Sequence, residues 1–421
     1  MKLRRRLPAV AELRPLLQLE RPTLDRTAAR LAKAADVADL RAIAKRRTPR
    51  PAFDYVDGAA LAEITAAKTR RAFHDVELVP RVLKGTSRVD TTVKIAGRIS
   101  ALPFGIAPTG FTRFMHAEGE DAGASAASRQ GVPFALSTMG TRSVEEVAAA
   151  SGAGQRWFQL YLWKDRNRSR ELMERAWAHG FDTLLVTVDT PVAGLRLRDV
   201  RNGMSIPPRL NLATIADAAI RPHWWFNFLT TDPLTFASLS SSTSSLPELI
   251  NSMFDPTLSW ADLEWIRGQW PGQLFVKGVL TPQDAQQCVA AGADGLVVSS
   301  HGGRQLDRSV VPLHQLPVIR EAVGPDTQIV YDSGILSGTD VVTALCLGAD
   351  FTMVGRAYLY GLMAGGESGV TKMIQILARE IEVTMHLLGV SRVAELNATH
   401  VHRGPADSAG PAETNTGYRV G

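Results

Sequence analysis

The sequence predicts an α/β fold of the TIM-barrel type, and three observations support this prediction. Eight short apolar runs rich in branched and aromatic residues follow one another along the chain. Outside one long interruption they begin about 20 to 35 residues apart, the length of one strand plus one crossover helix. Both faces of each run are apolar, as in the strands of a buried parallel sheet. Eight such units indicate a (β/α)8 barrel more often than a doubly wound sheet.

Each predicted strand is followed by Gly, Ser, Thr or Asp and then by a helical pattern. The eight predicted strands are 103–110, 133–138, 157–162, 183–190, 274–279, 295–300, 328–334 and 351–356. Ser143 or Thr141 can begin one helix with a capping box, because two glutamates follow. Pro282 marks the first turn of another helix, and a further helix is expected over 340–347.

Three segments lie outside the repeating pattern. The predicted parts are a helical N-terminal extension over 1–100, a barrel over 101–402 with an insertion after strand 4 at about 203–271, and a tail over 403–421. Within the extension we expect helices over 37–47 and around 58–73. The tail is rich in Gly, Pro, Ser and Thr, so we expect it to be disordered.

Composition and charge exclude some classes of protein and leave others open. Hydrophobic residues make up 45% and charged residues 21% of the chain, which is typical of globular proteins. No apolar run approaches the roughly 18 residues of a transmembrane helix, and the basic N-terminus lacks the apolar core of a secretory signal. The net charge of +5 permits an anionic partner without selecting one. Cys288 and Cys346 lie in apolar stretches and cannot form a disulfide framework, so we expect a reducing cytoplasmic setting. They also lack metal-ligand spacing, so we expect no metal.

Polar residues gather at the C-terminal ends of the predicted strands, where TIM barrels place their chemistry. These residues are Thr109, Gly110, Ser137, Thr138, Gln159, Tyr161, Thr187, Asp189, Lys277, Ser299, His301, Asp332, Gly334, Gly355 and Arg356. Strand ends meet water and are often polar for that reason alone. A lysine, a histidine, two aspartates and an arginine on one rim are less easily explained in this way, so we expect a binding or catalytic site there.

Lys277 is one of nine lysines and lies inside an apolar strand. An isolated buried ammonium group is costly, so Lys277 needs an anionic partner or a chemical task. Three roles stay open from the residues alone. Lys277 could be a Schiff-base nucleophile, it could stabilise an anionic cofactor, or it could form a structural ion pair with an aspartate of a neighbouring strand.

The segment 299–307 (SSHGGRQLD) is the densest motif of the chain. His301 directly follows a strand and suits a general base. Gly302 and Gly303 allow the backbone to approach a ligand closely, and Arg304 can bind a carboxylate with two hydrogen bonds. Asp189, at another strand end, could orient the imidazole.

Glycines and an arginine on the last two units predict a phosphate site. Gly334, Gly338, Gly355 and Arg356 lie where this fold commonly binds phosphate, through backbone amides and one guanidinium group. No G-x-G-x-x-G follows the first strand, and no G-x-x-x-x-G-K-[ST] is present. A nicotinamide cofactor on a Rossmann domain and ATP on a P-loop are therefore unsupported.

Taken together with Tyr55, 108–110, 159–161 and 187–191, these motifs resemble the FMN-dependent α-hydroxy-acid dehydrogenase and oxidase family. The resemblance covers about 37–401, with one motif per strand and in the same order. A finer resemblance is to the quinone-linked bacterial L-lactate dehydrogenases. It is carried by 193–199 (AGLRLRD), 203–205 (GMS) and 355–360 (GRAYLY).

The resemblance implies oxidation of an (S)-2-hydroxy acid, first of all L-lactate to pyruvate, with FMN as cofactor. It makes His301 the base for the substrate hydroxyl and Asp189 its partner. The implied substrate-binding residues are Tyr55, Tyr161, Arg196 and Arg304, with Arg196 rather than Arg198 as the active-site arginine. The implied FMN-binding residues are Thr109, Gly110, Ser137, Gln159, Thr187, Lys277, Ser299, Asp332, Gly334, Gly355 and Arg356. Among these, Lys277 would face flavin N1 and O2, and Gly110 would lie near N5.

Four positions depart from the family pattern. Ser300 replaces the usual Asn, and Met139 replaces the Trp of plant glycolate oxidase. Leu336 replaces a second phosphate-binding Arg, so we expect Arg356 to carry more of the phosphate charge. Gly110 replaces the Ala that many members place next to N5, which keeps an oxygen-using oxidase or a lactate monooxygenase open as the alternative.

The resemblance also implies a quinone acceptor and a homo-oligomer, with a tetramer typical of the family, and no nucleic-acid partner. Trp224 and Trp225, in the insertion, either anchor the protein at a membrane surface or pack onto the barrel. Basic residues at 4–6 and 45–47 would strengthen attraction to anionic lipid. We therefore expect a cytoplasmic protein, peripheral on the inner face of the cell membrane. Three further functions stay open, namely oxidation of a longer 2-hydroxy acid, a lysine Schiff-base aldolase and a non-catalytic basic binding module.

Overall fold

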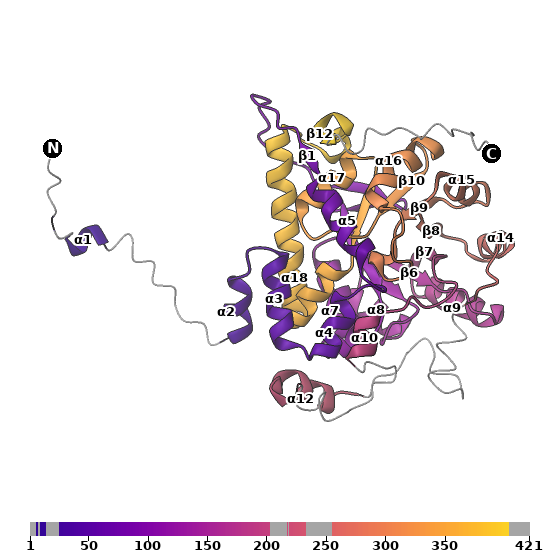
Figure 1. Ribbon diagram of the computed structural model, residues 1–421, viewed down its shortest axis with the longest axis horizontal. Helices are drawn as coiled ribbons and strands as arrows, with labels where there is room; N and C mark the ends of the chain where they lie inside the picture. Colours follow the sequence, from indigo (N-terminus) through magenta and orange to yellow (C-terminus); the bar gives the residue numbers. More distant parts are fainter. Residues whose placement is uncertain are drawn as a thin grey trace, which may run out of the picture.

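The computed structural model confirms the predicted barrel. It describes residues 25–202, 219–232 and 255–403, together with 6, 9–13 and 217. Eight parallel strands close in the order β10-β11-β4-β5-β6-β7-β8-β9 (Figure 1). The strands are β4 Phe104–Thr109, β5 Phe134–Ser137, β6 Arg156–Leu160, β7 Phe181–Thr187, β8 Gln273–Val279, β9 Gly295–Val298, β10 Gln328–Tyr331 and β11 Phe351–Val354. Each of the eight predicted runs overlaps one of them, and β6, β7 and β8 begin one or two residues before the run that predicted them.

Helices cover the outside of the barrel, one after each strand along the chain (Figure 1). They are α7 Gly119–Arg129, α8 Val144–Ser151, α9 Arg166–Ala178, α14 Trp260–Gln269, α15 Pro282–Ala290, α16 Pro312–Val323, α17 Gly338–Cys346 and α18 Arg356–Leu388. Ser143 caps α8 in a capping box with Glu146, and Pro282 begins α15 behind its N-cap Thr281. The helix predicted over 340–347 is α17, which begins two residues earlier.

Large side chains fill the interior of the barrel. Trp157 stacks on Phe275 at 6.1 Å between ring centroids and lies 5.8 Å from Phe351. All three are fully buried in the inner cluster. A Cβ at Gly295 would overlap the Phe275 ring, so β9 begins with a glycine to make room for it. Because the interior is packed, a ligand must bind above it, at the strand ends.

The N-terminal extension lies against one side of the barrel. It contains α2 Arg26–Ala32, α3 Val37–Arg47, α4 Arg50–Asp57 and α5 Ile64–His74. Helix α3 was predicted with the same bounds, and it packs on the long helix α18. The prediction of one helix around 58–73 was wrong at its start. The backbone amides of Ala60 and Leu61 donate to the carbonyls of Gly303 and Leu195, at 2.9 and 2.7 Å, instead of continuing a helix.

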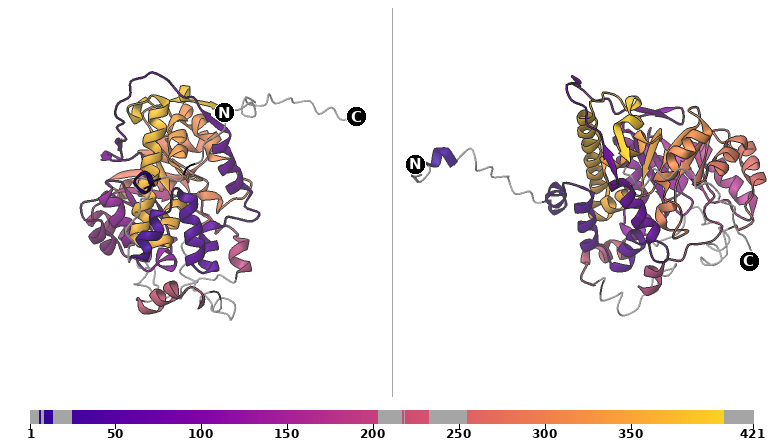
Figure 2. Two further views of the ribbon diagram at one scale, coloured as in Figure 1. Left: turned by 90° about the vertical axis from the view of Figure 1, so that its left-hand side faces the viewer. Right: turned by 45° about the horizontal axis from the view of Figure 1, so that its top comes forward.

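Two small sheets complete the described fold. β1 Val76–Leu78 pairs antiparallel with β12 Val401–Arg403 near the far end of the chain, and β2 Val93–Ile95 pairs with β3 Arg98–Ser100. Much of the predicted insertion, and the tail from residue 404 onward, lie outside the described residues. Between the undescribed parts, α12 Pro222–Thr230 lies at the edge of the molecule, below the N-terminal helices (Figure 2). Among the described residues no helix is both long and apolar enough to cross a bilayer.

Candidate active site

A cavity of about 630 Å³ lies over the C-terminal ends of the barrel strands. Thirteen of the seventeen predicted site residues line it. These are Tyr55, Thr109, Gly110, Ser137, Tyr161, Arg196, Lys277, His301, Arg304, Asp332, Gly334, Gly355 and Arg356. The remaining four are Gln159, Asp189, Ser299 and Thr187. The first three are hydrogen-bonded to the lining residues Ser137, His301 and Lys277, respectively. Thr187 is hydrogen-bonded to Gln159. The structure therefore brings the whole predicted set together.

His301 and Asp189 form a hydrogen-bonded pair at the cavity. The Nδ1 atom of His301 lies 3.1 Å from Oδ1 of Asp189. Burial alone would raise the pKa of Asp189, but the nearby His301 and Lys277 outweigh it and lower this pKa. Asp189 is therefore an anion that fixes the tautomer and orientation of the ring, which leaves Nε2 of His301 to accept a proton from a ligand.

The guanidinium groups of two arginines lie over the ring of Tyr55. The guanidinium carbons of Arg304 and Arg196 lie 4.8 and 5.4 Å from its centroid. Arg304 also donates to the carbonyls of Tyr55 and Gly58, and Arg196 is paired with Asp199 at 3.0 Å. Burial, together with Arg196, lowers the pKa of Arg304 to about 10. Positive charge is thus in excess here, and the site can hold a carboxylate.

Tyr161 lies on the same cavity with a fully protonated hydroxyl. Its backbone amide donates to the Thr138 hydroxyl at 3.1 Å, which fixes the residue just beyond β6. Burial raises the pKa of the Tyr161 phenol, and Asp189 and Tyr55 raise it further. Tyr161 therefore offers a neutral hydroxyl that can donate a hydrogen bond to a ligand.

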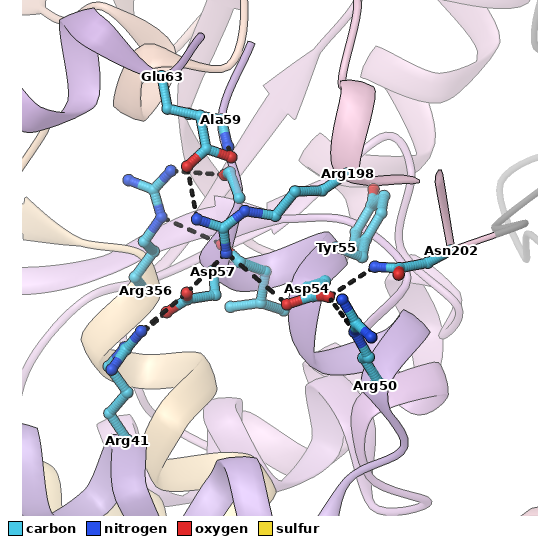
Figure 3. Close-up of polar contacts among 12 residues, drawn as sticks. Arg41, Arg50, Asp54, Tyr55, Asp57, Ala59, Glu63, Arg198, Asn202 and Arg356 are labelled. Carbon is cyan, nitrogen blue, oxygen red and sulfur yellow. Dashed lines mark hydrogen bonds and ion pairs between the residues drawn. The ribbon is translucent and has the colours of Figure 1, made fainter. Parts of the chain in front are cut away.

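Arg198 has different contacts from Arg196. It lies outside the cavity lining, in a network between α4 and α10 Leu197–Arg201 (Figure 3). Its guanidinium group pairs with Asp57 at 3.0 Å and with Glu63 at 2.5 Å. Asp57 also accepts from Arg41 at 2.6 Å and from the Tyr360 hydroxyl at 2.7 Å. The network therefore fixes α10, and with it Arg196, relative to the helix that carries Tyr55.

Replacing Arg198 with methionine is expected to raise the substrate KM about three- to tenfold with a smaller change in kcat, because lost charge-assisted bonds loosen the carboxylate site without removing a ligand-binding group. Arg201→Met is the matched control, since Arg201 is exposed on the same short helix. Steady-state kinetics with an artificial dye measures both constants. Equal KM values for the two variants would contradict the positioning role.

A row of hydrogen bonds supports the wall of the cavity between β5 and β7, and Ser137 is the member of the row that lines the cavity. The Ser137 hydroxyl donates to Gln159 at 2.9 Å, and the Gln159 amide donates to Thr187 at 3.0 Å. All three side chains are buried, and they come from neighbouring strands. The row gives this wall fixed donors and acceptors, as recognition of a polar ring edge requires.

Lys277 has the anionic partner that its burial demands. Its ammonium group lies 3.0 Å from Asp332 and donates to the Ser299 hydroxyl at 2.9 Å. Lys277 is 4% exposed and yet lines the cavity, so its charge faces any ligand bound there. The partner belongs to the end of β10, two strands away, rather than to an adjacent strand. An ammonium held by a carboxylate is a poor nucleophile, so the geometry disfavours the Schiff-base role.

The end of the cavity near the last two strands is suited to a phosphate group. Gly355 precedes α18, so the first amides of its N-terminal segment, which runs to a kink at Gly365 and Gly366, lie beside Gly334 and Arg356. Arg356 donates to the carbonyls of Val56 and Gly58, at 3.1 and 2.9 Å. Leu336 also lines this end, where it offers no charge.

Sequence reasoning missed Arg70 and Ser333. Arg70 reaches the cavity from α5, where it bonds the Gly334 carbonyl and pairs with Asp340 at 2.7 Å. Nothing in the sequence links a helix before the barrel to this position. Ser333 has a φ of +96°, and its hydroxyl accepts from the amides of Ser300 and Gly302, both at 3.1 Å. A non-glycine residue in this conformation beside a site is a strain signal that sequence alone does not carry.

The structure explains one departure from the family pattern, the glycine at position 110. A Cβ at Gly110 would lie 2.5 Å from Cβ of Met139 and 3.1 Å from its carbonyl oxygen. That carbonyl accepts from the Phe111 amide at 3.0 Å, so the backbone there cannot easily move. The Cβ and the backbone of residue 139 therefore require a glycine at position 110.

Replacing Gly110 with alanine is expected to lower stability by about 1–3 kcal/mol, the usual cost of overpacking. Thermal unfolding of the loaded protein measures the loss. In a Met139→Gly background the same substitution is expected to cost less, because the side chain that it meets is gone. An equal cost in both backgrounds would show that the two positions are not coupled.

Comparison with known proteins supports the same interpretation of the cavity. The family model described as FMN-dependent dehydrogenase matches residues 44–403. A Mycobacterium tuberculosis protein whose name gives L-lactate dehydrogenase as a provisional assignment is 54% identical over 95% of this chain and 97% of its own length. The L-lactate dehydrogenase of Caulobacter vibrioides is 43% identical over 87% of this chain and 97% of its own.

Two solved structures are also similar. The monotopic membrane protein (S)-mandelate dehydrogenase is 34% identical with a TM-score of 0.85, covering 88% of this chain and 100% of that chain. Mandelate oxidase is 35% identical with a TM-score of 0.76, covering 88% and 98%. The similarity thus extends over the barrel and over most of the N-terminal extension.

Proposed function

Because this chain belongs to the family of FMN-dependent dehydrogenases, we propose that it oxidises L-lactate to pyruvate and passes the electrons to a membrane quinone. One observation carries the proposal. The His301 ring, which Asp189 holds by a hydrogen bond from behind, and the two guanidinium groups on Tyr55 line one cavity. A 2-hydroxy acid has a hydroxyl for such a base and a carboxylate for such a cation pair, one carbon apart.

The residues of the cavity fit FMN. Its phosphate would be held by Gly334, Gly355 and Arg356 at the start of α18. The row of Ser137, Gln159 and Thr187 would meet the edge of the flavin ring, with Thr109 and Gly110 beside it, and Asp332 would meet the ribityl chain. The positive charge of Lys277, buried next to Ser299, suits a ring that becomes negative on reduction. Bound FMN supplies the two-electron acceptor that no side chain provides.

The chain's own residues supply binding and proton transfer. Arg304, Arg196 and Tyr55 hold the substrate carboxylate, and Tyr161 donates a hydrogen bond to the substrate. His301 takes the hydroxyl proton at Nε2, and the α-hydrogen would pass to bound FMN together with the two electrons of its bond. Asp189 stabilises the imidazolium that forms, because its carboxylate lies 3.1 Å from the ring.

Helix α12 supports a membrane location for the acceptor. Trp224 packs inward, stacked on Phe228 at 4.9 Å, and its indole donates to the Phe114 carbonyl at 3.0 Å. Trp225 is 37%, Phe226 58% and Leu229 69% exposed. The helix thus has one face on the barrel and an apolar face outward, as an interfacial helix requires. A peripheral position on the inner face of the cell membrane would bring the cavity close to a quinone.

Substitution of the two tryptophans is therefore expected to have opposite effects on vesicle binding and on stability. Trp225→Ser is expected to leave dye reduction and thermal stability intact and to weaken binding to phospholipid vesicles. Trp224→Ser is expected to cost about 1–3 kcal/mol of stability, because it removes packing against the barrel. Differential scanning fluorimetry and vesicle sedimentation measure the two effects. Unchanged vesicle binding in a stable Trp225→Ser protein would reject α12 as the contact.

A second candidate is an oxygen-using oxidase. It is favoured by Gly110 at the cavity wall and by the similarity to mandelate oxidase. The similarity to (S)-mandelate dehydrogenase likewise favours a larger 2-hydroxy acid as an alternative substrate. Both candidates preserve the chemistry of His301 and the arginines and differ in what enters or leaves the cavity.

One experiment tests all three possibilities. The purified protein is expected to be yellow with non-covalent FMN, and anaerobic L-lactate is expected to bleach it faster than mandelate does. Reoxidation by a ubiquinone analogue should then exceed reoxidation by air. Release of FAD, or no bleaching by any 2-hydroxy acid, would reject the function; faster bleaching by mandelate or faster reoxidation by oxygen would select the corresponding candidate.

A further inference from the structure

A second, smaller recess lies between α3, α6 Thr112–Met115 and α12. Its volume of about 20 Å³ has room for one water-sized group, such as a phosphate oxygen. The lining residues are Arg47, Thr48, Arg113, Met115, His116, Ala117, His223, Trp224, Asn227, Phe228 and Met363. We propose that this recess binds the phosphate of an anionic lipid headgroup, an inference that rests on the membrane contact proposed for α12.

The recess has positive groups and no carboxylate among its lining residues. Arg47 forms no hydrogen bond or ion pair within the described part of the chain, and its Nε atom is buried without a partner. Arg113 is 6% exposed, donates to the Asp232 carbonyl at 2.6 Å and has no partner for Nε in the same described residues. A buried guanidinium Nε without a hydrogen-bond acceptor is costly, so an anion bound beside Arg47 and Arg113 would be stabilising.

The two histidines report the same excess of positive charge. Burial lowers the pKa of His116, and His223 and Arg47 lower it further, whereas Glu118 raises it. For His223 burial is again the main cause of a lowered pKa, followed by Arg47. Glu118 lies outside the recess lining, and its carboxylate accepts from the Glu367 amide at 2.7 Å. Glu118 thus acts on the two histidines from outside the recess, and the lining itself holds no carboxylate.

The position of the recess favours a lipid over a free anion. His223 and Trp224 belong to α12, whose outward side chains Trp225 and Phe226 are exposed and apolar. A helix of this kind lies at the level of the lipid headgroups, with its aromatic rings among them. A headgroup phosphate would then sit at the same depth as the recess and meet Arg47 there. The apolar side chains of α12 and the charge of Arg47 would then contact the same lipid surface.

The test compares binding of the FMN-loaded protein to vesicles of phosphatidylcholine with and without phosphatidylglycerol. We expect the wild type to prefer the anionic vesicles. Arg47→Gln and His223→Gln are expected to weaken that binding, the first about five- to tenfold, as for loss of one basic group at a lipid surface. Arg46→Gln is the matched control, because Arg46 is exposed in the same helical turn and does not line the recess. Its expected loss is less than about twofold, and dye turnover is expected to be unchanged in all three.

Each outcome decides between the site and simpler explanations. Equal losses in Arg46→Gln and Arg47→Gln would indicate diffuse attraction and overturn the recess as a site. Equal binding of the wild type to both kinds of vesicle would also overturn the recess while leaving the membrane contact standing. Binding to neither kind would reject the membrane contact itself. A changed oligomeric state of Arg47→Gln in size-exclusion chromatography would assign the recess to a second copy of the chain instead.

Discussion

Replacement of His301 with glutamine is expected to leave FMN bound and to lower turnover by about 10²–10⁴-fold, the usual contribution of a general base. The reason is local: glutamine keeps a polar side chain at the end of β9 but cannot take the hydroxyl proton. Stopped-flow reduction by L-lactate measures the loss. Reoxidation of the dithionite-reduced variant by a dye should stay near the wild-type rate, because His301 has no task in that half-reaction. Reduction by lactate at the wild-type rate would remove His301 from the mechanism.

Replacement of Lys277 with methionine is expected to have a comparably large effect, on stability as well as on turnover. Asp332 would keep its buried position without the ammonium group that lies 3.0 Å away. Breaking a buried pair from one side typically costs about 3–5 kcal/mol. The protein should therefore unfold at lower denaturant concentration and lose FMN on gel filtration.

The double variant Lys277→Met/Asp332→Asn separates the two roles of the lysine. Without either charge, most of the lost stability is expected to return, because no uncompensated ion is left in the cavity wall. Reduction by L-lactate should nevertheless stay impaired, since the ammonium group that would face the reduced flavin ring is gone. Full recovery of turnover in the double variant would show that Lys277 serves the fold alone.

The barrel was predictable because each strand carries its own signal. Runs such as 183–190 and 351–356 are apolar on both faces and end in polar residues, and this pattern depends on nothing distant in the chain. The same rule placed His301, Lys277 and Asp332 on one rim without knowledge of the neighbours. Closure of the barrel then brought them to one cavity.

The failures arose where distant contacts decide local structure. Residues 58–63 contain three alanines, which favour a helix, yet two of their amides are used by Gly303 and Leu195. The next helix starts only after Glu63, whose φ is +63°. Arg70 was missed for a related reason, since its approach to Gly334 depends on how α5 lies on the barrel. Helix propensity depends on the local sequence and does not reflect such distant contacts.

The two tryptophans show the same limit within one turn of helix. The sequence alone does not indicate which of Trp224 and Trp225 packs on the barrel and which is exposed. The position of Phe114 decides between them, because Trp224 meets it edge-on at 5.8 Å and Trp225 faces away. Which of two adjacent aromatic residues is buried depends on the surface below.

The bond between Arg304 and the Tyr55 carbonyl joins positions 249 residues apart. During synthesis Tyr55 leaves the ribosome long before its partner exists, so α4 must wait while most of the barrel is made. A nascent chain that stops before the ninth strand, β9, would have most of its barrel strands but no place for a carboxylate. Premature termination would therefore yield chains that compete poorly for substrate, and the lag between the two halves of the site sets a lower bound on the time from translation to first turnover.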